Sequence, residues 1–168
     1  RAPIDVVVIA DTSYGIQKVR LQREAELVRE LVAGLGEDDR VQVLACATTC
    51  RTFGGFDKAS DALGRDLAAR LASVEPLGAT RLGAAFEAAR NALDGTAPER
   101  RRIVYLGDGV PSVGELDPAR VVESIRELIG DTHVTTVALG GETERAVLAG
   151  LGEGHASSFV DYTMMGSV

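Results

Sequence analysis

The sequence lacks any apolar run that approaches the length of a membrane span, and no segment resembles a signal peptide. It also lacks a surplus of positive charge, since 18 lysines and arginines stand against 25 aspartates and glutamates, for a net charge of -7. Nucleic acid is therefore not an expected partner, because phosphate binding needs a basic surface. A divalent cation or a basic protein surface suits this charge balance better. The chain begins with Arg1 instead of Met, so we expect it to be part of a longer protein.

Histidine is scarce, with two residues in the chain. His133 stands at the start of a predicted strand and His155 in a glycine-rich loop, so we expect surface or helix-end side chains and not general bases. The sequence contains no GxSxG elbow, no Walker loop and no GxGxxG after its first strand. We therefore expect a protein that is not an enzyme.

Cysteine is limited to Cys46 and Cys50, within the segment VQVLACATTCRTF. No CxxC or Cys/His cluster accompanies them, which argues against a zinc site. If residues 47–49 form a hairpin loop, the two cysteines face one another and the geometry allows a disulfide. The alternative is a pair of small buried side chains with free thiols. The sequence leaves both open, and export from the cytoplasm would favour the disulfide.

Short apolar segments alternate along the chain with segments of helical periodicity. Strands are predicted over residues 6–10, 41–46, 50–56, 102–106, 134–139 and 158–160. Helices are predicted over residues 16–35, after Asp57 or Ser60, after Thr80, from Asp117-Pro118 onward, and from Thr143 to about Gly152. The second and third strands are joined by so short a loop that they must pair antiparallel.

This order of elements predicts the fold class. Strands that alternate with helices require a mostly parallel sheet with helices on both faces. We expect an α/β fold, a Rossmann-like doubly wound three-layer sandwich whose central sheet has one antiparallel edge strand. One domain is expected over residues 1–163, and residues 164–168 are expected to be a tail or the start of a linker.

Polar loops follow two of the predicted strands. The first strand ends in DTSYG, residues 11–15, and the strand with IVYL at its centre ends in residues 107–109, while Thr80 opens a helix. Ligands of open α/β sheets bind at the carboxyl ends of parallel strands, so we expect these loops at one rim. Their hard oxygen ligands suit Mg²⁺, Mn²⁺ or Ca²⁺. Alternatively, Asp11 and Ser13 only cap the helix that follows them.

The segments DTSYG, GATRL and LGDG, in this order and on these elements, resemble the von Willebrand factor type A domain. The surroundings agree along nearly the whole chain, in VVVIADTS, GLGEDDRVQVLA, GATRLGAAFEAA, RRIVYLGDG and VTTVALG. The most similar form is that of bacterial surface proteins and inter-alpha-trypsin-inhibitor heavy-chain-like proteins. The resemblance implies a protein-binding module for adhesion or scaffolding, at the cell surface, in the periplasm or secreted, with a cytoplasmic location as the alternative.

That family carries a metal-ion-dependent adhesion site, built from an Asp-x-Ser-x-Ser loop, a Thr from a second loop and an Asp from a third. The resemblance assigns the ligands of a divalent cation, Mg²⁺ or alternatively Mn²⁺ or Ca²⁺, to Asp11, Ser13, Thr80 and Asp108. An acidic side chain of a protein partner would complete the coordination. Neither nucleic acid nor direct membrane insertion is implied. The ligand-binding rim would comprise Tyr14, Gly15, Arg81 and Gly109.

Two positions depart from the family pattern. Gly15 stands where the second serine is expected, and Arg81 follows Thr80 where an acidic or polar residue is common. A missing hydroxyl weakens an octahedral Mg²⁺ site, and a guanidinium nearby opposes a cation. Arg81 either points outward on its helix or lies over Asp11 or Asp108 as a substitute charge. Two hypotheses result: binding through a metal, or a metal-independent interaction or packing domain whose metal site is inactivated by Gly15 and Arg81.

Overall fold

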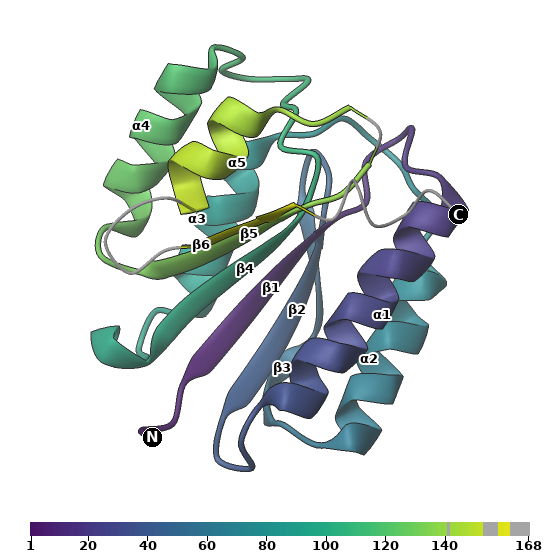
Figure 1. Ribbon diagram of the computed structural model, residues 1–168, viewed down its shortest axis with the longest axis vertical. Coiled ribbons are helices and arrows are strands. Elements are labelled where there is room, and N and C mark those ends of the chain that lie inside the picture. Colours follow the sequence, from purple (N-terminus) through teal and green to yellow (C-terminus); the bar gives the residue numbers. More distant parts are fainter. Residues whose placement is uncertain (141, 153–157, 162–168) are drawn as a thin grey trace.

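A six-stranded sheet lies between two layers of helices in the computed structural model, which describes residues 1–140, 142–152 and 158–161, the last four by backbone alone (Figure 1). The strands are β1 (Asp5–Asp11), β2 (Arg40–Cys46), β3 (Cys50–Lys58), β4 (Arg101–Gly107), β5 (His133–Ala138) and β6 (Ser158–Asp161). The helices are α1 (Lys18–Gly34), α2 (Asp61–Ala72), α3 (Leu82–Ala92), α4 (Pro118–Ile129) and α5 (Arg145–Gly152), with a 3₁₀ turn at Pro98–Arg100. The predicted domain boundary at residue 163 and His155 lie outside the described residues.

The strand order across the sheet is β3-β2-β1-β4-β5-β6. All neighbouring strands pair in parallel except β2 and β3, which form an antiparallel hairpin at the edge. The predicted α/β fold, with its single antiparallel edge strand, is confirmed. The chain runs from β1 to β2 on one side of β1, and β4 lies on the other side, so the strand order reverses at β1. The carboxyl ends of β1 and β4 are therefore the point where such sheets bind ligands.

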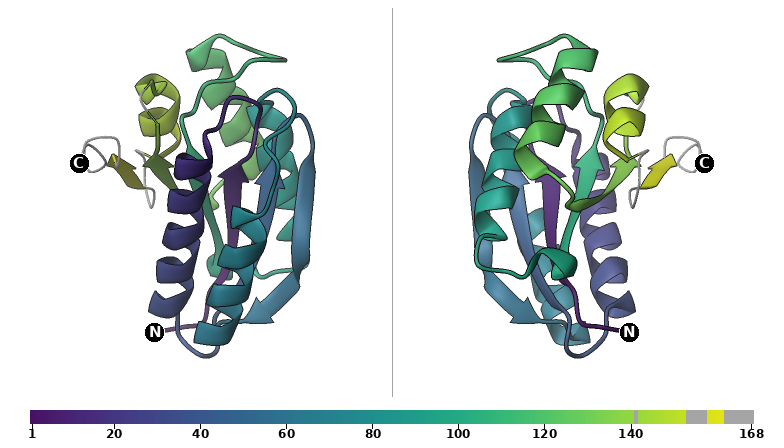
Figure 2. Two further views of the ribbon diagram at one scale, coloured as in Figure 1. Left: turned by 90° about the vertical axis from the view of Figure 1, so that its right-hand side faces the viewer. Right: turned by 90° about the vertical axis from the view of Figure 1, so that its left-hand side faces the viewer.

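Strand β1 lies at the centre and is buried along its whole length. Successive side chains of a strand point to opposite faces, so Val7 and Ile9 pack on one side and Val6, Val8 and Ala10 on the other. The first group joins a core beneath α3, α4 and α5, and the second joins a core beneath α1 and α2 (Figures 1 and 2). Two apolar cores thus hold a rigid strand that ends at Asp11.

The helix caps agree in part with the sequence. Ser60 and Asp117 cap α2 and α4 as predicted, since their side-chain oxygens accept hydrogen bonds from Leu63 N–H and Arg120 N–H. The prediction that Thr80 caps the next helix is wrong, because α3 begins one residue later and has Arg81 at its N-cap position without a side-chain bond.

The alternative in which Asp11 and Ser13 cap α1 is also wrong. This helix begins at Lys18, two residues later than predicted, and its N-cap residue Gln17 makes no side-chain cap bond. Asp11 and Ser13 therefore need another explanation than helix capping.

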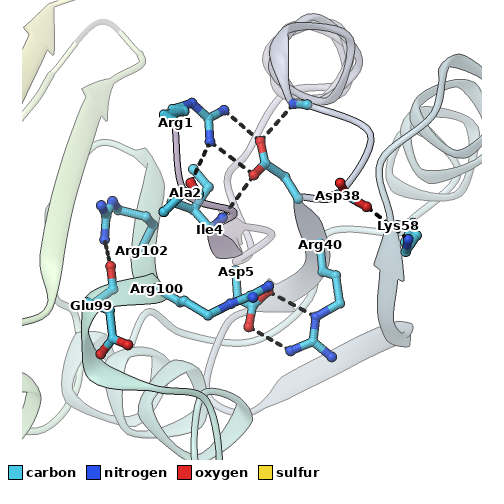
Figure 3. A network of polar contacts seen from close by, with 12 residues as sticks. Arg1, Ala2, Ile4, Asp5, Asp38, Arg40, Lys58, Glu99, Arg100 and Arg102 are labelled. Atoms are coloured by element: carbon cyan, nitrogen blue, oxygen red, sulfur yellow. Dashed lines mark hydrogen bonds and ion pairs between the residues drawn. The ribbon is translucent and has the colours of Figure 1, made fainter.

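Two buried aspartates pin the opposite end of the sheet, where β1 and β2 begin (Figure 3). Asp5 accepts hydrogen bonds from Arg40 Nε at 2.9 Å and Nη2 at 2.6 Å, and from Arg100 Nη2 at 2.9 Å. Asp39 accepts from Arg1 and from two backbone N–H groups. The guanidinium of Arg40, followed by that of Arg100, lowers the pKa of Asp5 to about 2. The ion pairs at this end of the sheet stabilise the fold, and the candidate functional site lies at the opposite end.

Candidate functional site at the carboxyl rim of the sheet

Three loops meet at the carboxyl rim, at the top of Figure 1: the β1–α1 loop, the α2–α3 loop and the β4–α4 loop. Backbone hydrogen bonds join them. Tyr14 N–H donates to Gly78 C=O at 2.6 Å, and Leu77 N–H donates to Thr12 C=O at 3.1 Å. Ser112 N–H donates to Thr80 C=O at 3.0 Å. The rim is thus one connected surface.

Asp11 ends β1 and is almost fully buried. Its Oδ1 accepts a hydrogen bond from Ser13 N–H at 3.0 Å, which forms a tight turn immediately after the strand. Burial, followed by the negative charge of Asp108, raises the pKa of the Asp11 carboxyl. A carboxylate placed like this needs a positive partner.

Asp108 lies beside Asp11 on the β4–α4 loop, as predicted from their positions after neighbouring strands. Its Oδ1 accepts from Val110 N–H at 2.9 Å, and its backbone C=O accepts from Glu144 N–H at 2.7 Å. Gly109 N–H donates to the hydroxyl oxygen of buried Tyr105 at 3.3 Å. Both carboxyls of Asp11 and Asp108 therefore have one oxygen engaged by backbone and the other turned toward a common partner.

That partner is Arg20, which sequence reasoning missed. Its Nη2 donates to Asp11 Oδ2 and its Nη1 donates to Asp108 Oδ2, each at 3.3 Å. The Arg20 side chain is 15% exposed, so the pair of contacts is largely shielded from solvent. Arg20 bridges the two carboxylates that the family resemblance assigns to a metal.

Glu24 lies one helical turn after Arg20 and is completely buried. Neither of its carboxyl oxygens has a hydrogen-bond partner among the described residues, and the same holds for Arg20 Nε. Burial, followed by the negative charge of Asp11, raises the pKa of Glu24 well above its ordinary value. A signal for this group was visible in the sequence, because Glu24 interrupts the apolar stripe of α1 that contains Leu21, Ala25 and Val28.

Ser13 and Thr80 are both buried at the rim, close to Asp11. Thr80 lines the same small cavity as Asp11. Its backbone N–H donates to the Ser112 hydroxyl oxygen at 2.8 Å, so the β4–α4 loop holds it in place. The structure thus gathers the four positions predicted as metal ligands, Asp11, Ser13, Thr80 and Asp108, at one place.

The two departures from the family pattern have different consequences. Gly15 has a φ of 99°, a conformation that favours glycine, and a side chain added there would meet open space. Arg81 is exposed, and the described residues include no ion pair that it makes. Of the two predicted orientations of Arg81, the substitute charge over the aspartates is therefore not the one observed. Arg20 takes that place.

A divalent cation does not fit this arrangement of side chains. Mg²⁺ needs oxygen ligands at about 2.0–2.1 Å, and two nitrogens of Arg20 stand against the carboxylate oxygens that would supply them. Gly15 contributes no hydroxyl. The site as folded suits a guanidinium.

Cys46 and Cys50 are joined by a disulfide across the β2–β3 hairpin, with their Cα atoms 4.1 Å apart. The bond lies beside the rim, because Thr12 N–H donates to Cys46 C=O at 2.8 Å and Arg81 N–H donates to Ala47 C=O at 3.2 Å. Of the two states that the sequence left open, the structure has the oxidised one. The disulfide closes the hairpin against which two rim loops are fixed.

Replacing both cysteines with alanine should lower the free energy of unfolding by about 2 kcal/mol, the loop-entropy value for so short a ring. At this chain length that corresponds to a drop in Tm of about 4–8 °C in thermal unfolding. Alkylation with iodoacetamide before reduction should modify neither cysteine of the wild type. Modification of both without reductant would show that the bond is absent in solution.

Apolar side chains are exposed mainly at this rim. The large hydrophobic residues most exposed among the described ones are Tyr14, Val19, Leu77, Val110 and Leu116. Four of them lie on the three rim loops, and Val19 lies in the first turn of α1 beside them. An apolar surface gathered at one end of a domain is typical of a protein-binding site.

The sequence profile of the von Willebrand factor type A domain matches residues 6–110, and the chain belongs to this family. No curated protein matches the chain. The mostly parallel sheet with one antiparallel strand and flanking helices matches the fold of this family.

Solved structures agree on the fold. The proximal thread matrix protein 1 of the mussel byssus, with a zinc-occupied MIDAS motif, is 18% identical at a TM-score of 0.71, over 98% of this chain and 42% of that one. The manganese-loaded TRAP protein of Plasmodium vivax is 17% identical at a TM-score of 0.69, over 95% and 69%. An aerotolerance-related membrane protein of Bacteroides fragilis is 22% identical at a TM-score of 0.62, over 82% and 68%. The chain thus spans about two fifths of the mussel protein.

Proposed function

We propose that this domain is a non-enzymatic protein-binding module, for adhesion or scaffolding, that holds its partner at the carboxyl rim. The observation that carries the proposal is the gathering of Tyr14, Leu77, Val110 and Leu116 there, on loops tied to one another by backbone hydrogen bonds. Tyr14 is 81% exposed. Exposed aromatic side chains held on a rigid scaffold are frequent hot spots of protein interfaces.

The chemistry of the partner follows from Arg81. A groove of about 210 Å³ lies between the start of α3 and α4, with buried Leu82, Val121 and Ile125 among its lining residues and Arg81 at its margin. Arg81 is exposed, and no ion pair within the described residues engages it. A guanidinium in this position suits a carboxylate, and the groove suits an apolar side chain. The partner is an extended protein segment that carries an acidic residue beside an apolar one.

The location proposed for the domain is the cell surface, the periplasm or the extracellular space, with the cytoplasm as the alternative. The Cys46–Cys50 disulfide supports an oxidising compartment. No helix among the described residues is long and apolar enough to cross a membrane.

Selection of peptides from a random display library provides the test. Bound peptides should be enriched in sequences with Asp or Glu next to a large apolar residue. Arg81→Ala and Leu77→Ser should each weaken the selected peptides at least tenfold, about 1.4 kcal/mol, in calorimetric titrations. Because both side chains are exposed, neither substitution should change Tm.

Arg65→Ala is the matched control, because Arg65 is exposed on α2 away from the rim and its loss should leave affinity unchanged. Peptides that bind Arg81→Ala and Leu77→Ser as tightly as wild type would refute a rim site. Binding that disappears in a chelator would instead support the metal-mediated hypothesis, in which the partner carboxylate coordinates a divalent cation held by Asp11, Ser13, Thr80 and Asp108.

A further inference from the structure

Arg20 reaches the rim from the third residue of α1 and lies between carboxylates that come from two other elements. One Nη atom faces Asp11 at the end of β1, and the other faces Asp108 at the end of β4, both at 3.3 Å. The equal distances place the guanidinium midway between the two acids.

The surroundings of Arg20 are shaped to hold it. Gly140 follows β5 with a φ of 110°, and a Cβ atom there would come within 3.0 Å of Arg20 Nη1. The absence of a side chain at Gly140 thus leaves room for the guanidinium. On the inner side, Glu24 lies on the same face of α1, at the spacing that brings side chains of a helix together. The Arg20 side chain is therefore largely shielded, with Gly140 leaving room for its guanidinium.

Charge explains what this position accomplishes. Two carboxylates that share a shielded site repel one another, and a cation between them removes that repulsion. Two proteins of similar fold hold a metal by name, one with a zinc-occupied MIDAS motif and the other loaded with manganese. A planar guanidinium with two separate Nη donors can bind both carboxylates at once, which a lysine ammonium cannot match in geometry.

We propose that Arg20 is an internal replacement for the divalent cation of the adhesion site, so that Asp11 and Asp108 are neutralised by the chain itself. The rim then keeps its shape without any metal ion. This role is separate from partner binding at Arg81 and the apolar side chains, and it holds whether or not the rim binds a peptide.

Manganese binding followed by electron paramagnetic resonance tests the replacement on the wild type and on variants. The wild type should leave the signal of free Mn²⁺ undiminished, and its Tm should be the same in Mn²⁺ and in a chelator. Arg20→Ala should unfold at a lower Tm in chelator, because two carboxylates lose their partner, and Mn²⁺ should restore about 5 °C or more. Arg29→Ala is the matched control, because Arg29 is exposed on the same helix away from the rim and its loss should change neither reading.

Variants at Gly15 distinguish the two features that would prevent metal binding, the missing hydroxyl and the guanidinium of Arg20. Gly15→Ser alone should bind no Mn²⁺, whereas Gly15→Ser combined with Arg20→Ala should bind it at least tenfold more tightly than the wild type. Gly15→Ala with Arg20→Ala carries the same backbone strain without the hydroxyl, and should bind more weakly than the serine variant.

Two results would overturn the role of Arg20. Stoichiometric loss of the free Mn²⁺ signal with the wild type would show that a metal enters despite Arg20. Full Mn²⁺ binding by Gly15→Ser with Arg20 retained would show that the missing hydroxyl, and not the arginine, excludes the ion. The first measurement uses the unaltered protein, so it stays decisive even if Arg20→Ala does not fold.

Discussion

Replacing Glu24 with methionine should raise the free energy of unfolding by about 1–3 kcal/mol at pH 8, because it removes the cost of burying a polar group without a hydrogen-bond partner. Glu24 is fully buried on the inner face of α1, and its carboxyl oxygens have no hydrogen-bond partner among the described residues. Methionine keeps the unbranched shape and removes the two polar atoms. Urea unfolding monitored by circular dichroism measures the change.

The pH dependence of the free energy of unfolding provides a second test of the role of Glu24. Burial raises the pKa of Glu24 in the folded protein, so the folded state binds its proton more tightly than the unfolded state. The wild type should therefore lose stability as the pH rises above about 4.5, the ordinary value for a glutamate, up to the raised value. The advantage of Glu24→Met should grow over the same interval.

Glu26→Met provides the control, because Glu26 is exposed on the same helix and its replacement should stay within about 0.5 kcal/mol at every pH. A Glu24→Met variant that is less stable than wild type at pH 8 would contradict the prediction. That outcome would mean that Glu24 is ionised in the fold and holds Arg20 in position through its charge.

Asp5→Asn is expected to have the largest destabilising effect, about 3 kcal/mol at neutral pH. The Asp5 side chain is fully buried, and its two oxygens accept three hydrogen bonds from Arg40 and Arg100. An amide of the same shape keeps one acceptor and turns a donor toward the arginines. Removing one partner of a buried pair costs about 3–5 kcal/mol, and the partial exposure of both arginines favours the lower end.

Acid should remove the difference between Asp5→Asn and the wild type. The pKa of Asp5 is lowered to about 2 in the folded protein, from an ordinary value of 3.8. Its contribution is therefore fully present above about pH 4 and is lost as the pH falls toward 2. Unfolding curves measured at pH 7, 4 and 2.5 should show the difference in stability between the two proteins becoming smaller as the pH falls.

Asp38→Asn serves as the control for Asp5. Asp38 pairs with Lys58 at 3.0 Å, but both side chains are more than half exposed. Surface pairs of this kind contribute about 0–1 kcal/mol, so the control should change little at any pH. An equal loss of stability in both variants would show that the burial of Asp5 has no energetic importance.

The fold could be predicted from the sequence because its signals are local. The apolar run at residues 6–10, the three-residue loop between the cysteines, and Asp117 before Pro118 each specify one element on its own. Thr80 was harder to place, because the partner that fixes its backbone is Ser112, more than 30 residues further along the chain. A cap and a loop anchor look alike until that partner is known.

The sequence predicts the two acidic residues of the candidate site but not the arginine that lies between them. Asp11 and Asp108 follow neighbouring strands, so topology alone brings them together. The direction of the Arg20 side chain depends on how α1 is oriented against the sheet. No local sequence pattern specifies that orientation. Arg81 stands inside a family motif, yet its side chain is exposed at the rim. The position of Glu24 within an apolar stripe is the local sign in the sequence that α1 directs an ionisable side chain toward the sheet.

The attachment of Arg20 to the chain has a consequence for how such a domain responds to its surroundings. A free ion occupies its site according to its concentration, so a chelator or a change of compartment empties it. A tethered guanidinium meets its carboxylates at an effective concentration fixed by the backbone of α1, which dilution cannot alter. A family member that depends on metal can register the supply of ions. This chain, with Arg20 in place, would be indifferent to it and would be regulated, if at all, through the abundance of its partner.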